Sequence, residues 1–443
     1  MTARSFIARL SAVCCIVAVC CLAQPAAGLC QDTARQTLSL AEVWKIALEQ
    51  NKDVLCAREY KNKVQGMYVE ARATALPHLT LKGSFYRGVD ETEDILTSGF
   101  MPSLATASEG GLVMDQVIFT WGQVSAAIRG AKVGLLTAGD ELRLYSQAAL
   151  RDTAAGFYDV LLAKELLAIS TGNLDSKKRH KDATDKRYKA GLATDYDVLA
   201  AQVGVENAKP DVITAENLVD TARDHLGFLL GMEGRAVDVA GSLARDLTSS
   251  TQTFEDAYAI ALSNRPEVAS VSHRTEMAKE LATVYSSADK PRLDLHGEFG
   301  WKGLEASQIW AAGEESVVGV FFTFPFFDGY ATRGKVAQAK SDEATLRIQS
   351  AKLKDAIGLD VSVAQRRVKE TAQIVLSLSG TVSQAEKLLS MAEKGYEYGV
   401  KTRLDVEDAQ LAVMQARGGL AKARRDYQVA LINLKWTMGV LGE

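Results

Sequence analysis

The sequence predicts a mainly helical protein with four β-strands, arranged as two tandem copies of one structural unit. Three observations support this fold class. A fifteen-residue segment occurs twice, two long intervals contain no proline, and two pairs of short segments alternate between apolar and polar residues. The chain has 443 residues, is 47% hydrophobic and has a net charge of −4, so it can bury a large core and shows no basic patch for nucleic acid.

The repeated segment begins at Tyr188 and occurs again at Tyr396, 208 residues later. Seven of its fifteen positions are identical, more than a shared helical composition would produce. Weaker matches extend the repeat along most of the chain. We therefore expect a first repeat over residues 37–235 and a second over 252–443, each made of a helix, a β-hairpin and a long helical hairpin.

The amino terminus has the pattern of an export signal. Two arginines precede an apolar run from about Leu10 to Ala23, and small residues follow, so we expect a signal peptide over residues 1–28. Four of the six cysteines lie in that run and Cys30 lies beside the cleavage region, so no disulfide framework is expected. Leu29 is a poor residue before a lipid-modified cysteine, which favours an unlipidated chain.

Long helices are predicted where proline is absent. The intervals from Pro102 to Pro210 and from Pro325 to Glu443 are rich in good helix formers. A helix from about Val124 to Lys189 would be roughly 100 Å long. Such a length indicates coiled-coil packing in an extended bundle.

Two β-hairpins are predicted, over residues 78–119 and 291–327. In their first strands, Leu79 and Leu81 or Leu293 and Leu295 alternate with polar residues, which gives each strand one apolar and one polar face. Each strand has about the 9 to 11 residues that a tilted strand needs to cross a bilayer, and aromatic residues lie in or beside the strands as in interface girdles.

Four strands cannot close a barrel, and open sheet edges are not tolerated in lipid. If these strands lie in a membrane, two chains would pool eight strands and three would pool twelve. Two soluble hairpins at the end of a helical bundle are the alternative.

The turns between the long helices, over residues 188–197 and 396–405, share the pattern Gly-x-x-Thr-x-x-Asp. The glycine would end one helix in a left-handed conformation. The threonine would cap the next helix, and the aspartate would complete a capping box. These residues are Gly191, Thr194 and Asp197 in the first tip and Gly399, Thr402 and Asp405 in the second.

No enzyme site is predicted. The segment Gly329–Val336 differs by one residue from a phosphate-binding loop, but Val336 replaces the hydroxyl that would hold magnesium. The five histidines show no metal-ligand spacing, and no nucleophile lies near a base in the sequence. We therefore expect no catalytic residue, no cofactor and no metal.

With these motifs, the chain resembles the TolC family of outer membrane channel-tunnels from Gram-negative bacteria. The resemblance covers about Thr37 to Glu443 and includes the strand starts at Pro77 and Pro291, the segment Pro325–Gly329 and both tips. It implies a trimer with a twelve-stranded β-barrel in the outer membrane lipid and a long α-helical barrel in the periplasm. Such channels serve tripartite efflux or type I secretion as passive conduits gated at their tips. The first repeat departs from the pattern at Val117 and Thr120-Trp121.

The resemblance also implies partners and roles for residues. A periplasmic adaptor, or membrane fusion protein, would dock at the tips, and an inner-membrane pump or ABC transporter would supply energy. Asp405 and Asp408 match acids that ring the pore constriction, and Asp197, Tyr396 and Lys401 match a latch between neighbouring coils. Gly191, Thr194, Gly399 and Thr402 would form the tip turns and contact the adaptor. The alternative is a soluble periplasmic coiled-coil adaptor or scaffold without a pore.

Overall fold

The computed structural model describes residues 36–89, 104–232, 237–244, 252–306 and 309–442. The chain divides into two compact units, residues 1–36 and residues 37–443. Gln36 is the one described residue of the first unit, and all the other described residues belong to the second. The predicted signal peptide over 1–28 and Cys30 lie outside the described residues.

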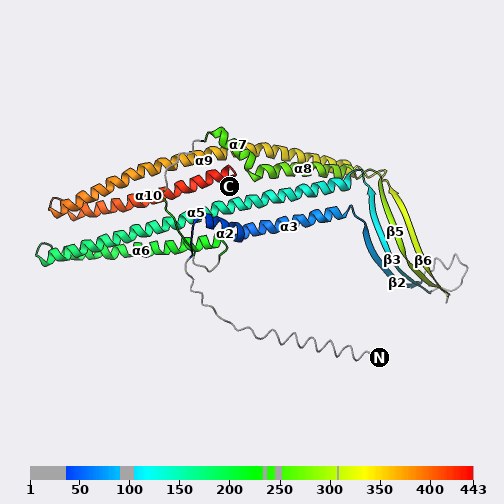
Figure 1. The fold of residues 1–443 in the computed structure, drawn as a ribbon, viewed down its shortest axis with the longest axis horizontal. Helices are drawn as coiled ribbons and strands as arrows, with labels where there is room; N and C mark the ends of the chain where they lie inside the picture. The colour runs from blue at the N-terminus through cyan, green and yellow to red at the C-terminus, as the bar shows by residue number, and fades with distance from the viewer. Residues whose placement is uncertain (1–35, 90–103, 233–236, 245–251, 307–308, 443) are drawn as a thin grey trace, which may run out of the picture. The chain divides into compact units, whose positions relative to one another are not determined.

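Two helical hairpins of matching size dominate the structure (Figure 1). The first consists of α5 (Gln123–Lys189, 67 residues) and α6 (Asp195–Leu229, 35 residues). The second consists of α9 (Ala331–Glu397, 67 residues) and α10 (Arg403–Thr437, 35 residues). The equal lengths confirm the two-repeat fold class and the long helix expected from about Val124. No described helix is long and apolar enough to span a bilayer.

Each repeat opens with a pair of short helices rather than the single helix that was expected. The pairs are α2 (Leu40–Gln50) with α3 (Lys52–Ala73), and α7 (Phe254–Asn264) with α8 (Pro266–Ser286). In the first repeat, the side chain of Asn51 accepts hydrogen bonds from the backbone N–H groups of Asp53 and Val54. Asn51 therefore caps the amino terminus of a new helix.

In the second repeat the break has a different cause. Arg265 precedes Pro266 and adopts an extended conformation, because proline disfavours a helical residue before it. Proline is tolerated at the first position of the following helix. Pro210, by contrast, lies inside α6, at the position that corresponds to Gly418 in α10.

The four strands form one antiparallel sheet in the order β2-β3-β5-β6. Their bounds are His78–Val89, Leu104–Phe119, Arg292–Ala306 and Ile309–Thr323. Pairing of β3 with β5 joins the two repeats. The last strand ends four residues before the predicted limit at 327, and the chain then turns through Gly329 and Tyr330, which both have positive φ.

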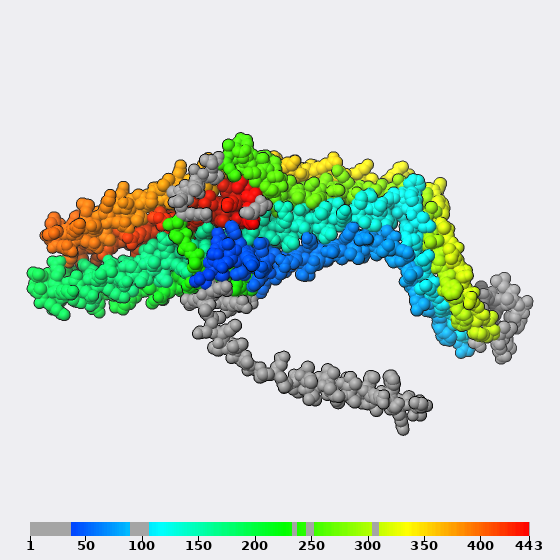
Figure 2. Space-filling model, in the orientation of Figure 1, coloured from blue at the N-terminus to red at the C-terminus, as the bar shows by residue number. Residues whose placement is uncertain are grey.

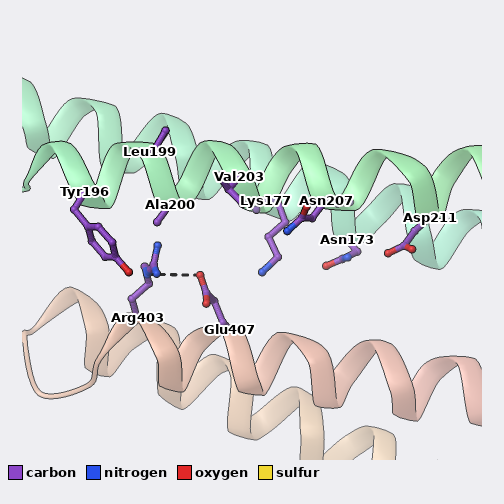
Figure 3. Close-up of a pocket in the computed structure, with 12 residues that line it drawn as sticks. Asn173, Lys177, Tyr196, Leu199, Ala200, Val203, Asn207, Asp211, Arg403 and Glu407 are labelled. Carbon is purple, nitrogen blue, oxygen red and sulfur yellow. Dashed lines mark ion pairs between the residues drawn. The ribbon is translucent and has the colours of Figure 1, made fainter.

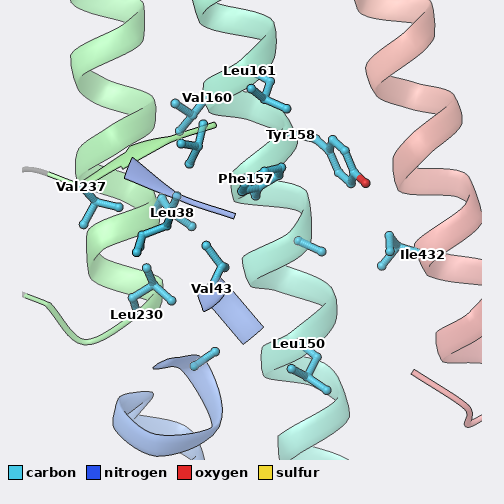
Figure 4. Close-up of a cluster of buried hydrophobic side chains, with 14 of the residues drawn as sticks. Leu38, Val43, Leu150, Phe157, Tyr158, Val160, Leu161, Leu230, Val237 and Ile432 are labelled. Atoms are coloured by element: carbon cyan, nitrogen blue, oxygen red, sulfur yellow. The ribbon is translucent and has the colours of Figure 1, made fainter. Parts of the chain in front are cut away.

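The best-packed core lies where the short elements meet the long helices (Figure 4). Strand β1 (Gln36–Leu38) pairs with β4 (Val237–Val239), a small sheet that the sequence reading missed. Leu38 and Val43 are almost fully buried against α5 residues such as Phe157. A corresponding cluster in the second repeat packs α7 against α9 and α10 around Ile357, Val361 and Tyr427. These two cores hold the hairpins together at mid-length, and the tips of the hairpins project beyond the cores (Figure 1 and Figure 2).

Candidate functional sites: the two-faced sheet and the helical tips

One face of the sheet is apolar and exposed. The strand register aligns Leu81, Leu112 and Phe299 in one row, with 82%, 46% and 63% of their surface exposed. An exposed apolar area this broad marks a surface that contacts lipid or protein. Further large apolar residues on this face are Leu79, Phe85, Trp301, Val318, Val320 and Phe322.

The other face of the sheet is polar. Lys302 on β5 lies opposite Glu109 on β3, with Nζ and Oε1 3.6 Å apart. His296 and Asp115 join the same two strands through a contact of 2.7 Å between Nδ1 and Oδ1. The alternation predicted for the first strands, β2 and β5, is thus confirmed, whereas on β6 the apolar residues Val317 and Phe321 also lie on this face. The two faces suit two different environments.

The sheet has two open edges. Strands β2 and β6 each pair with one neighbour in the described part of the chain, so one side of each has backbone groups that remain available for pairing. An open edge bordered by an apolar face invites further strands.

The two tips have the predicted capping geometry. Gly191 and Gly399 both have φ of 74°, the left-handed conformation in which glycine avoids the strain of a side chain. In the second tip, the backbone N–H of Thr402 donates to Asp405 Oδ2 at 2.8 Å, and the N–H of Asp405 donates back to Thr402 Oγ1 at 3.3 Å. The first tip repeats this pattern with Thr194 and Asp197.

The second tip holds two candidate pore acids. Hydrogen bonds from Thr402, and then from Lys401, lower the pKa of Asp405 to about 2. Lys401 Nζ lies 3.1 Å from Asp405 Oδ1. Asp408 is exposed and lies one turn further along α10, so the two carboxylates project from one side of the helix.

Aromatic and cationic side chains connect the two tips. The guanidinium of Arg187, at the end of α5, lies 5.1 Å from the ring centre of Tyr396 at the end of α9. The guanidinium of Arg403, at the start of α10, lies 6.0 Å from the ring centre of Tyr196 at the start of α6. Sequence reasoning missed Arg187, Arg403 and Tyr196, since their contacts join segments about two hundred residues apart.

Each of the three predicted latch residues, Asp197, Tyr396 and Lys401, contacts a different residue of the same chain. The Asp197 carboxylate is part of its own capping box, and its pKa is lowered by hydrogen bonds from Thr194 and, more weakly, by the charges of Arg403 and Arg187. Tyr396 lies against Arg187, and Lys401 pairs with Asp405.

A groove of about 560 Å³ runs between α6 and α10 beside the tips (Figure 3). Tyr196, Leu199 and Val203 form an exposed apolar wall on α6. Arg403 and Glu407 form the opposite wall on α10, 3.6 Å apart. The remaining lining residues are Asn173, Lys177, Ala200, Gly204, Asn207, Ala208, Asp211.

In the segment that resembles a phosphate-binding loop, an aspartate of the chain already binds the amino terminus of the following helix. Asp328 Oδ2 accepts a hydrogen bond of 2.8 Å from the backbone N–H of Thr332, in the first turn of α9. A carboxylate therefore already lies where an anion would bind a helix amino terminus. Within the described ranges, no group of three or more histidine, cysteine or acidic residues is arranged to hold a metal ion.

Comparisons with known proteins agree with this architecture. The chain matches the model of a family described as outer membrane efflux protein twice, over residues 43–232 and 257–440. It is 21% identical to outer membrane protein TolC of Vibrio cholerae over 412 residues, 91% of each chain. It is 24% identical to alkaline protease secretion protein AprF of Pseudomonas aeruginosa, over 92% of this chain and 85% of that one. A membrane protein from Pseudomonas aeruginosa has a similar structure, with a TM-score of 0.78, 21% identity and coverage of 90% and 93%.

Proposed function

The chain belongs to the outer membrane efflux protein family, and on this premise we propose that it is a passive channel in a Gram-negative outer membrane, leading from the periplasm to the exterior. The observation that carries the proposal is the two-faced sheet with open edges, at the opposite end of the long helices from the tips (Figure 1). Its apolar face suits lipid, and its polar face suits an aqueous lumen. The helices would extend into the periplasm.

A trimer is the assembly that we propose. Four strands are too few for a barrel, whereas three chains would supply twelve and pair every β2 edge with a neighbouring β6 edge. Exposed apolar side chains along α9 provide a second surface on which chains can meet. They include Ile348, Leu359, Ile374, Leu376, Leu388 and Met391.

We propose that Asp405 and Asp408 form the pore constriction. Both lie at the tip, and three copies would place six carboxylates around the narrow end. The low pKa of Asp405 supports this role, because it keeps that carboxylate charged at any physiological pH. A ring of carboxylates favours cations and lets them block the pore.

The latch that we propose is the set of contacts that keep the two tips of a protomer together and the constriction closed. Asp197 and Tyr396 belong to it through the arginines of the opposite tip, and Lys401 belongs to it through its ion pair with Asp405. The arginines that face Asp197 and Tyr396 support this assignment, because they connect the first tip with the second.

The groove between α6 and α10 is the proposed docking surface for a periplasmic adaptor. Its apolar wall on α6 and charged wall on α10 suit an amphipathic helix. The tip turns at Gly191, Thr194, Gly399 and Thr402 would border the contact. An inner-membrane pump or ABC transporter would supply the energy, since we propose no enzymatic activity for this chain.

The name of one relative, AprF, refers to protease secretion, and that of TolC to the outer membrane. Efflux and type I secretion therefore both fit, and the inner-membrane partner would decide between them. We also propose residues 37–235 and 252–443 as the limits of the repeats, which is supported by the two matched ranges. A soluble adaptor is disfavoured, because it would have to leave the apolar sheet face in water.

Purification from membranes and insertion into a planar bilayer test the proposal. We expect extraction by detergent only, the mass of a trimer, and a small conductance that cations block and that grows when Asp405 and Asp408 are replaced by alanine. A water-soluble monomer or dimer without conductance would overturn the channel and favour the scaffold.

A further inference from the structure

We propose that His180 is the pH sensor of the gate, and that its protonation separates the two helical tips of each protomer. The inference rests on the channel function proposed above and adds a regulatory residue to it. His180 belongs to α5, about two turns before the first tip, and the sequence marked it only as a histidine without metal-ligand spacing.

The side chain of His180 lies between the two hairpins. Its ring centre is 6.0 Å from the ring centre of Tyr396 at the end of α9. Arg187, two turns further along α5, lies over the same tyrosine. Tyr396 therefore lies beside two α5 side chains, so the charge of His180 affects a contact that joins the two hairpins.

The Nε2 nitrogen of His180 is buried and has no hydrogen-bond partner in the described part of the chain. Among the described residues, its Nε2 and the Nη1 of Arg403 are the buried side-chain nitrogens without one. A proton added to Nε2 would give a charged group buried away from water with no acceptor. The closed contact therefore favours the neutral imidazole.

Charges on two helices face His180. The largest single effect among these charges is that of the Glu407 carboxylate on α10, which raises the pKa of His180, whereas Lys177 and Arg187 of α5 and Arg403 of α10 each lower it. From α9 the facing group is the phenol of Tyr396. The Asp197 carboxylate of α6 accepts the hydrogen bonds of its own cap. Burial, together with these three cations, lowers the pKa of His180 below its ordinary 6.5.

The sign of the effect follows from this lowered pKa. In separated tips His180 would return to its ordinary value, so the separated state binds the proton more readily than the closed state. Closure is therefore complete above pH 6.5 and weakens as the pH falls below it. A protonated His180 would repel Arg187, which contacts Tyr396 of the second hairpin. It would also repel Arg403, which contacts Tyr196 of the first hairpin.

Separation of the tips would release α10, which bears the proposed constriction acids. The constriction itself would not lose charge, since the pKa of Asp405 is about 2. Acid would thus widen the pore and leave its preference for cations intact. A periplasm that becomes acidic would favour the open channel.

The test compares the mature trimer with two histidine variants in planar bilayers at pH 7.5 and pH 5.5. We expect a several-fold rise in conductance at pH 5.5 for the wild type and for His225→Gln, an exposed histidine on α6 that serves as the matched control. His180→Gln should show the same conductance at both values. An equal acid response in His180→Gln would overturn the inference, as would a cation-blockable wild-type pore that ignores acid.

A second measurement does not depend on conductance or on His180→Gln folding. Spin labels at Ala190 and Tyr398, in a background with Cys30→Ser and Cys56→Ser, report the separation of the two tips. We expect the labels to move apart between pH 7.5 and 5.5. Lys177→Gln should shift the midpoint to lower pH, because loss of that cation raises the closed-state pKa of His180 and narrows its difference from the separated state. Unchanged label distances would overturn the inference. Moving labels in a protein that forms no pore would instead count against the channel.

Discussion

Lys401 and Asp405 form an ion pair inside the second tip, with 3.1 Å between Nζ and Oδ1. The proposed pore acid thus has a cation one helical turn before it. Both side chains are substantially exposed, so the pair contributes little to stability. Its effect should appear in the field that permeating ions meet.

We expect Lys401→Gln to strengthen block by cations, because three positive charges would be removed beside the constriction of a trimer. Single-channel current as a function of blocker concentration measures the change. Lys189→Gln, on the first tip, is the matched control and should leave the block unchanged. Equal effects of the two variants would place Lys401 outside the constriction.

Replacement of the two pore acids should separate charge from capping. Asp408→Asn removes a charge and leaves the tip intact, whereas Asp405→Asn also weakens the capping box. Both should weaken cation block. Amide hydrogen exchange in the first turn of α10 should accelerate in Asp405→Asn alone, and equal exchange in the two variants would contradict the capping role.

Cation block should resist acid over a wide range. The pKa of Asp405 is lowered to about 2, so the carboxylate stays charged, and its capping bond persists, until the pH approaches that value. In a variant with His180→Gln and Asp408→Asn, which removes the other acid response and the second constriction carboxylate, the remaining block should be constant from pH 7 to pH 4. Loss of block near pH 4 would show that Asp405 titrates normally.

Two glycines with the same conformation should respond differently to alanine. Gly399 and Gly439 both have φ of 74°, but a Cβ at Gly399 would meet open space, whereas one at Gly439 would lie 2.8 Å from the backbone of Asn264 and Arg265. Gly399→Ala should cost about 1 kcal/mol from conformation alone. Gly439→Ala should be far more destabilising in thermal unfolding, and similar melting temperatures would contradict the close packing.

The apolar sheet face should not tolerate charge. Leu81→Arg would place a cation in lipid, at about 2 to 4 kcal/mol per chain near the bilayer centre. We expect the variant to fail to assemble in the outer membrane, as judged by fractionation and trimer yield. Thr80→Arg, on the polar face of the same strand, should assemble normally. Normal assembly of Leu81→Arg would show that this face does not meet lipid.

The sequence predicted the local parts of this structure well. The tips follow from Gly191, Thr194 and Asp197, because helix caps depend on residues three positions apart. The return strand from Leu104 was harder to predict, since its first half is rich in small and polar residues. It forms because β2 and β5 pair with it on both sides, and Gly111 lies so close to Gly300 that a side chain there would meet backbone at 3.0 Å.

The family resemblance implied a latch at Asp197 and Tyr396, but the arginines that contact these residues could not be predicted from sequence. Arg187 and Tyr396 are separated by most of a repeat, and an arginine at the end of a helix is ordinarily a solvated group that complements the helix dipole. Only the packing of α10 on α5 brings these residues together. The burial of His180 Nε2 has the same origin.

Pairing of β3 with β5 makes the β-hairpin of one repeat continuous with the β-hairpin of the next. In a trimer, the ring would then consist of six similar half-chains, with an approximate sixfold axis. Because both halves lie in one chain, their sequences can differ at equivalent positions. The first tip has Ala193, Asp195 and Ala200 where the second has Lys401, Arg403 and Asp408. One half can therefore specialise as the moving part of the gate, while the other remains its fixed frame.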